Sequence, residues 1–247
     1  IIINNQFVSA APTTLTPKGN LKIGNVTKSL VTGTQVIGNP YASAISFDKV
    51  LYNGATPNTA GHYFYYWDPK TDGSHNVGKF ISVKNTGVGE PSAYTIAPNT
   101  NSSGIVDGAI ESGAAIVINS SGAPNSMTFH ETDKKITSST VGIASRPVAP
   151  TGIADLSRLY TNLYYVNATG AKVIADGVAG TYCPTYTNEV DYADVPKLIS
   201  FNSKESISIL RDGKLLSIET RQTLSTDNDT TVYEIRNLDN RNYRLEF

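Results

Sequence analysis

The fold of this chain is decided by residues 36–47, which read Val36-Ile37-Gly38-Asn39-Pro40-Tyr41-Ala42-Ser43-Ala44-Ile45-Ser46-Phe47. The β-branched residues that lead into this stretch predict a buried strand. The Gly-Asn-Pro triplet then ends the strand, because Gly and Asn tolerate a positive φ and Pro lacks a backbone donor. Ser43 is a suitable N-cap for a short helix that the apolar spacing predicts up to Tyr52. We interpret the stretch as a structural landmark made of Gly38, Asn39, Pro40, Tyr41 and Ser43.

The aromatic run at residues 62–67 is the most strongly β-forming segment of the chain. By the two-residue period of a strand, Tyr63, Tyr65 and Trp67 face one side, and Phe64 and Tyr66 face the other. Aromatic residues on both sides are typical of a central strand that is buried on both faces, and this is the favoured interpretation. The alternative is a ligand site in which the first three rings are exposed and stack on sugar rings.

These two segments resemble a module that recurs in large secreted surface proteins of Bacteroidota, which are similar to cargo of the type IX secretion system. In that module a GNPY block precedes a Tyr-Phe-Trp strand and two further strands, and the similar segments here are residues 38–45, 63–68, 111–118 and 127–129. Residues 158–163 and 212–218 are also similar to it. Ala115-Ile116 replaces a Phe pair of the pattern, and Tyr160-Thr161 displaces a Leu. The resemblance implies an extracellular, β-rich module, and it names neither a ligand nor a reaction.

Composition suits a β-rich protein outside the cell and argues against nucleic-acid binding. The 247 residues include 20 Lys and Arg against 21 Asp and Glu, for a formal net charge of −1. A nucleic-acid-binding protein needs a basic face, which this balance does not supply. No run of about 18 apolar residues occurs, so we expect no membrane-spanning helix. Cys183 is the single cysteine, which excludes an internal disulfide and predicts a small buried residue.

Short β-forming segments separated by turns predict an all-β fold. We expect an antiparallel β-sandwich of jelly-roll or Greek-key type, with two packed halves and one short helix after the GNPY turn. The Pro-containing residues 144–155 separate a first half, residues 1–146, from a second, residues 147–247, and one continuous domain is the alternative. Asp212-Gly213 predicts a type I′ hairpin between residues 206–210 and 215–219. Residues 188–195 are expected to be helical.

The sequence lacks the motifs of common enzymes. It has no G-x-S-x-G, no H-E-x-x-H and no phosphate-binding loop, and its three histidines are scattered. The best candidate metal site is Asp227-Asn228-Asp229, because two carboxylates at i and i+2 in a polar loop offer oxygen ligands to Ca²⁺. Most Asp/Asn loops are only turns. We therefore expect no cofactor, with Ca²⁺ as the alternative.

The leading hypothesis is a non-catalytic structural or adhesion module of a large secreted cell-surface or fibre-forming protein. Its partners would be adjacent modules of the same protein, further copies in a fibre, or surface glycans, and neither nucleic acid nor a membrane span is expected. The alternative is a carbohydrate-binding or spacer module of a secreted polysaccharide-degrading enzyme, and a catalytic domain is a third hypothesis. Ile1-Ile2-Ile3 and residues 243–247 are β-prone, so we expect both to continue into, or pair with, neighbouring modules.

Overall fold

A computed structural model describes residues 18–52, 63–68, 78–85, 94–99, 109–120, 126–135, 156–198, 205–224 and 229–247, together with two short strands near the start of the chain. Those two strands, β1 (Ile2–Ile3) and β2 (Gln6–Phe7), pair with each other in antiparallel fashion. The described elements are strands, apart from one short helix and one 3₁₀ turn. The all-β prediction is therefore confirmed.

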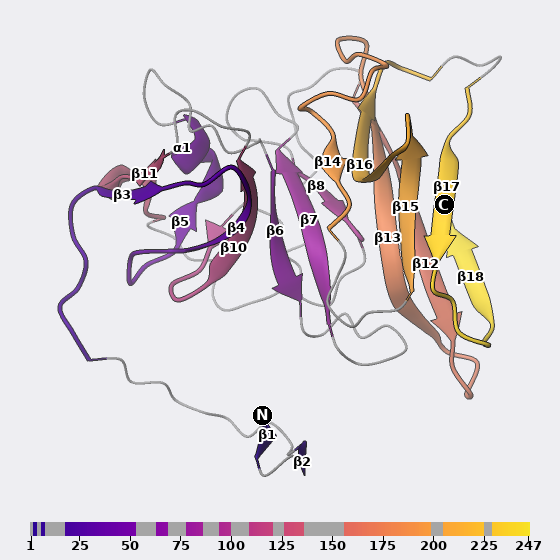
Figure 1. Ribbon diagram of the computed structural model, residues 1–247, viewed down its shortest axis with the longest axis horizontal. Helices are drawn as coiled ribbons and strands as arrows, with labels where there is room; N and C mark the ends of the chain where they lie inside the picture. The colour runs from indigo at the N-terminus through magenta and orange to yellow at the C-terminus, as the bar shows by residue number, and fades with distance from the viewer. Residues whose placement is uncertain are drawn as a thin grey trace.

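A five-stranded antiparallel sheet with the order β4-β10-β6-β7-β8 forms the centre of the first half. Its strands are β4 (Gly33–Gly38), β6 (Tyr63–Asp68), β7 (Lys79–Asn85), β8 (Tyr94–Ala97) and β10 (Ala115–Ser120). One face is covered by the pairs β3–β11 and β5–β9 and by α1 (Figure 1). These smaller elements are β3 (Val26–Ser29), β5 (Ile45–Ser46), α1 (Phe47–Tyr52), β9 (Ala109–Ile110) and β11 (Ser126–Phe129), followed by the 3₁₀ turn Glu131–Asp133.

The second half forms a seven-stranded sheet in which six strands follow the order β17-β15-β16-β13-β12-β18 and β14 pairs with β16. The strands are β12 (Ser157–Val166), β13 (Lys172–Tyr182), β14 (Val195–Pro196), β15 (Ser206–Arg211), β16 (Lys214–Arg221), β17 (Val232–Arg236) and β18 (Tyr243–Glu246). Only the β13–β16 pair is parallel among the strand pairs of the described residues. The sheet curls, so that the rings of Tyr233 on β17 and Phe247 after β18 lie 6.2 Å apart.

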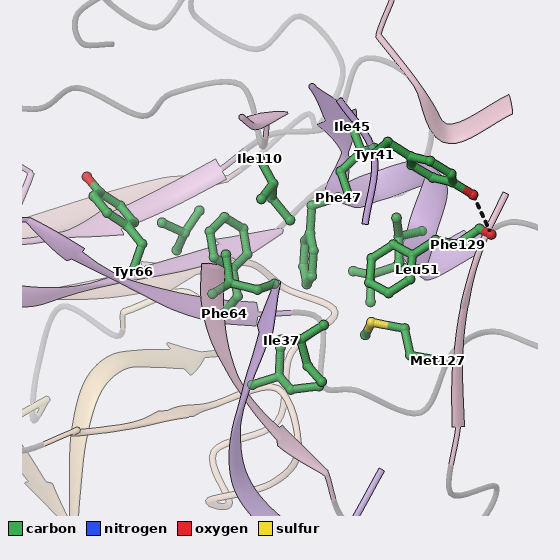
Figure 2. Packing of buried hydrophobic residues seen from close by; sticks show 14 of the residues in the cluster. Ile37, Tyr41, Ile45, Phe47, Leu51, Phe64, Tyr66, Ile110, Met127 and Phe129 are labelled. Atoms are coloured by element: carbon green, nitrogen blue, oxygen red, sulfur yellow. Dashed lines mark hydrogen bonds between the residues drawn. The ribbon is translucent and has the colours of Figure 1, made fainter. Parts of the chain in front are cut away.

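The two sheets pack face to face around a shared core. Tyr63 and Tyr65 of β6 belong to one buried cluster with Ala179 of β13 and Ile218 of β16. The opposite face of β6 supplies Phe64 and other residues to the core beneath α1 (Figure 2). The predicted β-sandwich with two packed halves is therefore present, and the proposed boundary at residues 146 and 147 lies outside the described residues.

Local predictions near the GNPY block need three corrections. The strand that enters the block is an edge strand rather than a buried one, and Val36 is 68% exposed. Gly38 and Asn39 do not adopt a positive φ. The helix begins at Phe47 and not after Ser43, because Ile45 and Ser46 pair with β9 first.

Two turn regions had different outcomes. The hairpin prediction is confirmed, since Asp212 and Gly213 have φ values of 48° and 74° between β15 and β16, as a type I′ turn requires. The helix expected at residues 188–195 is wrong, because residues 188–194 form bends and turns and Val195 begins β14. Its acidic side chains bond to nearby backbone N–H groups, which favours turns over a helix.

Candidate functional site

The aromatic strand β6 places the predicted sugar-binding residues in two different environments. Tyr63 and Tyr65 are 6% and 3% exposed and lie between the two sheets. The Tyr65 hydroxyl donates a hydrogen bond to the carbonyl of Pro196 at 2.7 Å, so its acceptor belongs to the second sheet. Burial raises the pKa of the Tyr65 hydroxyl, which stays protonated as a donor.

Trp67 is the one residue of this predicted set that reaches solvent. Its side chain is 36% exposed and packs edge-on against Phe80 of β7, with ring centroids 5.0 Å apart. The two residues are directly opposite each other in the β6–β7 register. A ring held in this way offers one exposed aromatic surface, whereas a platform of all three rings would also require Tyr63 and Tyr65 to be exposed.

A buried ionic cluster lies where the two sheets meet. Lys79 of β7 donates to the backbone carbonyl of Glu205, and the Lys197 ammonium lies 2.8 Å from the carboxylate of Asp176 on β13. Lys79 and Asp176 are each 2% exposed. Burial lowers the pKa of Lys79, and the carboxylates of Asp176 and Glu205 only partly offset that effect.

Asp176 is held as a carboxylate by several contacts. Burial alone would raise its pKa, but the nearby ammonium groups of Lys197 and Lys79 and the N–H of Ile207 outweigh that effect and lower it. The cluster therefore pairs opposite charges from both halves of the sandwich. The Asp176–Lys197 ion pair lies within the second half, and the Lys79 ammonium of the first half approaches it across the boundary between the sheets.

A second buried lysine faces a tightly bonded loop. Lys84 of β7 is 3% exposed, and burial lowers its pKa to about 8, although the carboxylates of Asp194 and Asp191 act in the opposite direction. The Asp194 carboxylate accepts hydrogen bonds from the backbone N–H groups of Thr220 at 2.7 Å and of Asp191 at 2.9 Å. The same loop exposes Tyr192, whose side chain is 82% accessible. The loop is thus anchored in the interior while it presents an aromatic ring to solvent.

The predicted metal site is described only in part, since Asp227 and Asn228 lie outside the described residues. Asp229 forms an ion pair with Arg221 at 2.5 Å, so one of its oxygens is already engaged by a cation. Arg221 also lies 3.9 Å from Glu219, whose pKa is raised by burial. Within the described part of the chain, no three His, Cys, Asp or Glu side chains gather as a metal site.

The GNPY block forms a dense network of hydrogen bonds. The Asn39 amide nitrogen lies 2.9, 2.9 and 3.1 Å from the carbonyls of Ser43, Ile110 and Glu111, which share its two N–H donors. The Asn39 amide oxygen accepts a hydrogen bond from the N–H of Tyr41 at 2.9 Å. These contacts tie the turn to β9 and the residue that follows it. The Ser43 hydroxyl is buried and has no hydrogen-bond partner among the residues that the structure describes. Pro40 is only partly buried at the surface of this turn.

Tyr41 connects the block to the rest of the first half. It is 2% exposed, and its hydroxyl lies 2.9 Å from the carbonyls of both Gly24 and Phe129 (Figure 2). A single hydroxyl proton serves only one of these acceptors at a time. The Lys134 ammonium lies 4.4 Å from the centre of the ring, a cation–π geometry. These contacts give the block an architectural position in the core.

Sequence reasoning missed the buried charges between the sheets. A weak signal was present, because Lys79 and Lys84 lie at the two ends of a β-forming segment that contains Phe80, Ile81 and Val83. A charge in such a segment indicates either an exposed strand or a buried pair, and only the structure identifies the partners.

Comparison of the chain with protein-family models, with curated proteins and with solved structures finds no match. Among the described residues, no helix has the length and apolar character needed to cross a membrane.

Proposed function

We propose that this chain is a non-catalytic structural or adhesion module of a large secreted surface protein. The observation that carries this proposal is the packing of strand β6. Aromatic side chains on one of its faces pack in the core of the first half, and those on the other face pack against the second sheet, so the strand joins the two halves. The hydrogen bond from the Lys79 ammonium to the carbonyl of Glu205 and the contact between the Ser82 and Ser217 hydroxyls reinforce the same boundary. An extended surface protein needs units that resist separation under load. A boundary held by both aromatic packing and polar contacts supports that role.

The extracellular part of the proposal rests on the resemblance of the GNPY block and on the polar, weakly charged composition. It is tested by mild protease treatment of intact cells that make the protein, with mass-spectrometric detection of released peptides. Peptides of this chain are expected from intact cells, in amounts comparable to those from lysed cells. Release only after lysis would overturn the extracellular assignment.

Carbohydrate binding is the second candidate, and the half-exposed ring of Trp67 beside Phe80 supports it. Trp67→Ala should then lose retention in native gels that contain a polysaccharide, while its melting temperature stays close to that of the parent. Tyr192→Ala is the matched control, because it removes an exposed ring at a different place. Equal retention of the parent, the variant and the control would exclude Trp67 as a sugar-binding residue.

A further inference from the structure

Among the described residues, no strand pairs with one edge of the seven-stranded sheet. β18 is the last strand in the sheet order and, within this part of the chain, pairs only with β12; Figure 1 shows it at the outer margin of the molecule. Leu245 is 36% exposed, and Phe247, directly after the strand, is 74% exposed although its ring also lies 6.2 Å from that of Tyr233 on β17. A free strand edge with exposed apolar side chains is a surface to which a further strand adds.

The backbone of β18 has its hydrogen-bonding groups in the right direction for such an addition. The N–H of Val166 donates to the carbonyl of Asn242 at 2.8 Å, so the backbone groups of Asn242 point toward β12. These groups alternate in direction along an antiparallel strand. The backbone groups of Tyr243 and Leu245 therefore point toward the free edge.

The residues of this edge are complementary to themselves. They read Tyr243-Arg244-Leu245-Glu246-Phe247, with Leu245 at the centre, opposite charges on either side and an aromatic ring at each end. In an antiparallel pair of two copies with Leu245 opposite Leu245, Arg244 faces Glu246 of the second copy. Tyr243 then faces Phe247. Opposite charges and aromatic rings are favourable cross-strand pairs.

The charged pair also lies on one face within a single copy. The Arg244 guanidinium lies 3.2 Å from the Glu246 carboxylate, and Lys172, the first residue of β13, also contacts that carboxylate. In the two-copy arrangement, each positively charged Arg244 lies opposite a negatively charged Glu246 of the other copy, on one face of the joined strands. The apolar and aromatic residues meet on the opposite face, since neighbouring residues of a strand point to opposite sides.

We propose that two copies of this chain form a symmetric dimer by pairing their β18 edges about Leu245. This inference goes beyond the structural role proposed above and does not depend on it. β17 is the strand at the other end of the sheet order and carries Glu234-Ile235-Arg236, but Asn237 has a φ of 57° and leaves the strand conformation. β17 therefore has no matching residue to complete the same symmetric pairing about Ile235.

The dimer should be weak, because a strand edge of this length buries far less than the about 1,200 Å² of a stable interface. We expect a dissociation constant above about 1 µM. Sedimentation velocity of the 247-residue chain at increasing concentration measures it. A chain that stays monomeric up to about 1 mM would overturn the proposal.

Charge reversal tests the register. Arg244→Glu places Glu opposite Glu, and Glu246→Arg places Arg opposite Arg, so each variant alone should associate at least tenfold more weakly. An equimolar mixture of the two should recover association, because every cross-strand pair between the different chains is again of opposite charge. Both variants are made with Lys172→Ala, so that the new arginine does not face Lys172, and Lys172→Ala alone is the reference.

Arg236→Glu on β17 is the matched control, and its association should equal that of the parent chain. Melting curves of all variants establish that each remains folded. Single charge-reversal variants that associate as well as the reference would overturn the proposed register. A mixture that shows no recovery would do the same.

Discussion

The hydroxyl of Ser82 on β7 donates to the hydroxyl of Ser217 on β16 at 2.8 Å, although 135 positions separate them in the chain. Both residues are buried, at 3% and 1% exposure. The Ser217 hydroxyl also lies 3.2 Å from the carbonyl of Val195 and 3.3 Å from that of Pro196, so its own proton has an acceptor. The two halves of the sandwich are thus joined by a satisfied polar contact as well as by apolar packing.

Removal of either hydroxyl should destabilise the protein by a different amount. Ser82→Ala takes away a donor and leaves Ser217 bonded to the carbonyls, so we expect a loss of about 0.5–1.5 kcal/mol. Ser217→Ala leaves the Ser82 hydroxyl buried without its acceptor, and the expected loss is about 1–3 kcal/mol. Urea denaturation of both single variants and of the double variant measures the coupling. Losses that simply add would show that the two hydroxyls do not interact.

Stability should rise with pH in the alkaline range because of Lys84. Its pKa is about 8 in the folded chain against an ordinary value of 10.5, so between these values the unfolded chain binds more protons. The free energy of unfolding therefore increases as pH rises through this window, by up to about 3 kcal/mol when the lowered pKa is converted.

The control for this pH dependence is Lys84→Met, which keeps a long side chain without the charge. It should be more stable than the parent near neutral pH and should lose the part of the alkaline increase that Lys84 contributes, while Lys79, whose pKa burial also lowers, keeps its own contribution. Buried tyrosines such as Tyr65 have raised pKa values and destabilise the folded chain only at higher pH. Denaturation between about pH 7 and pH 9.5 avoids their ionisation. If the free energy of unfolding of Lys84→Met rises with pH as steeply as that of the parent, Lys84 is not the cause of the increase.

The GNPY block should be sensitive to loss of the Tyr41 ring. Tyr41→Ala removes a buried aromatic side chain and should lower stability by about 2–4 kcal/mol. Tyr41→Phe removes only the hydroxyl and should cost about 1 kcal/mol. Pro40→Ala should also lower the melting temperature. Thermal melting of the three variants tests this, and unchanged melting of Tyr41→Ala and Pro40→Ala would contradict the interpretation of the block as a structural landmark.

Gly177 should tolerate no side chain. A Cβ atom there would lie 2.7 Å from Cβ and 2.9 Å from Cα of Pro98, so it would press the second sheet against the first half. We expect Gly177→Ala to cost about 1–3 kcal/mol. Gly38→Ala is the control, because a Cβ there meets nothing within 4 Å and its φ is not left-handed. Equal melting of the two variants would contradict the close contact.

Local features of this fold were predictable where a residue type dictates its own geometry. Asp212-Gly213 specified its turn because both positions require a positive φ, and the double-sided aromatic pattern of β6 indicated burial on both faces. The edge position of β4 was not predictable, since β-branched residues such as Val36 fit an exposed edge as well as a core. Whether Trp67 is covered also depends on its neighbour Phe80 and not on its own strand.

The polar contacts between the sheets were beyond sequence reasoning for a different reason. Lys79 and Asp176 each look unfavourable in a buried strand until the other is placed nearby. Their proximity depends on how two separate sheets stack, and local pattern carries no information on that register. Periodicity identified the side of β6 on which Tyr65 lies, but not its acceptor at Pro196.

The bond between Tyr65 and Pro196 spans 131 positions, and this separation fixes an order of events during synthesis. The first sheet can be assembled once β10 and β11 have left the ribosome, because β4 and β3 pair with them. The face of β6 that carries Tyr63 and Tyr65 then remains uncovered until β13 and β16 are made. During that interval the nascent chain exposes an aromatic surface, so the period between the two halves is when it most needs protection from aggregation.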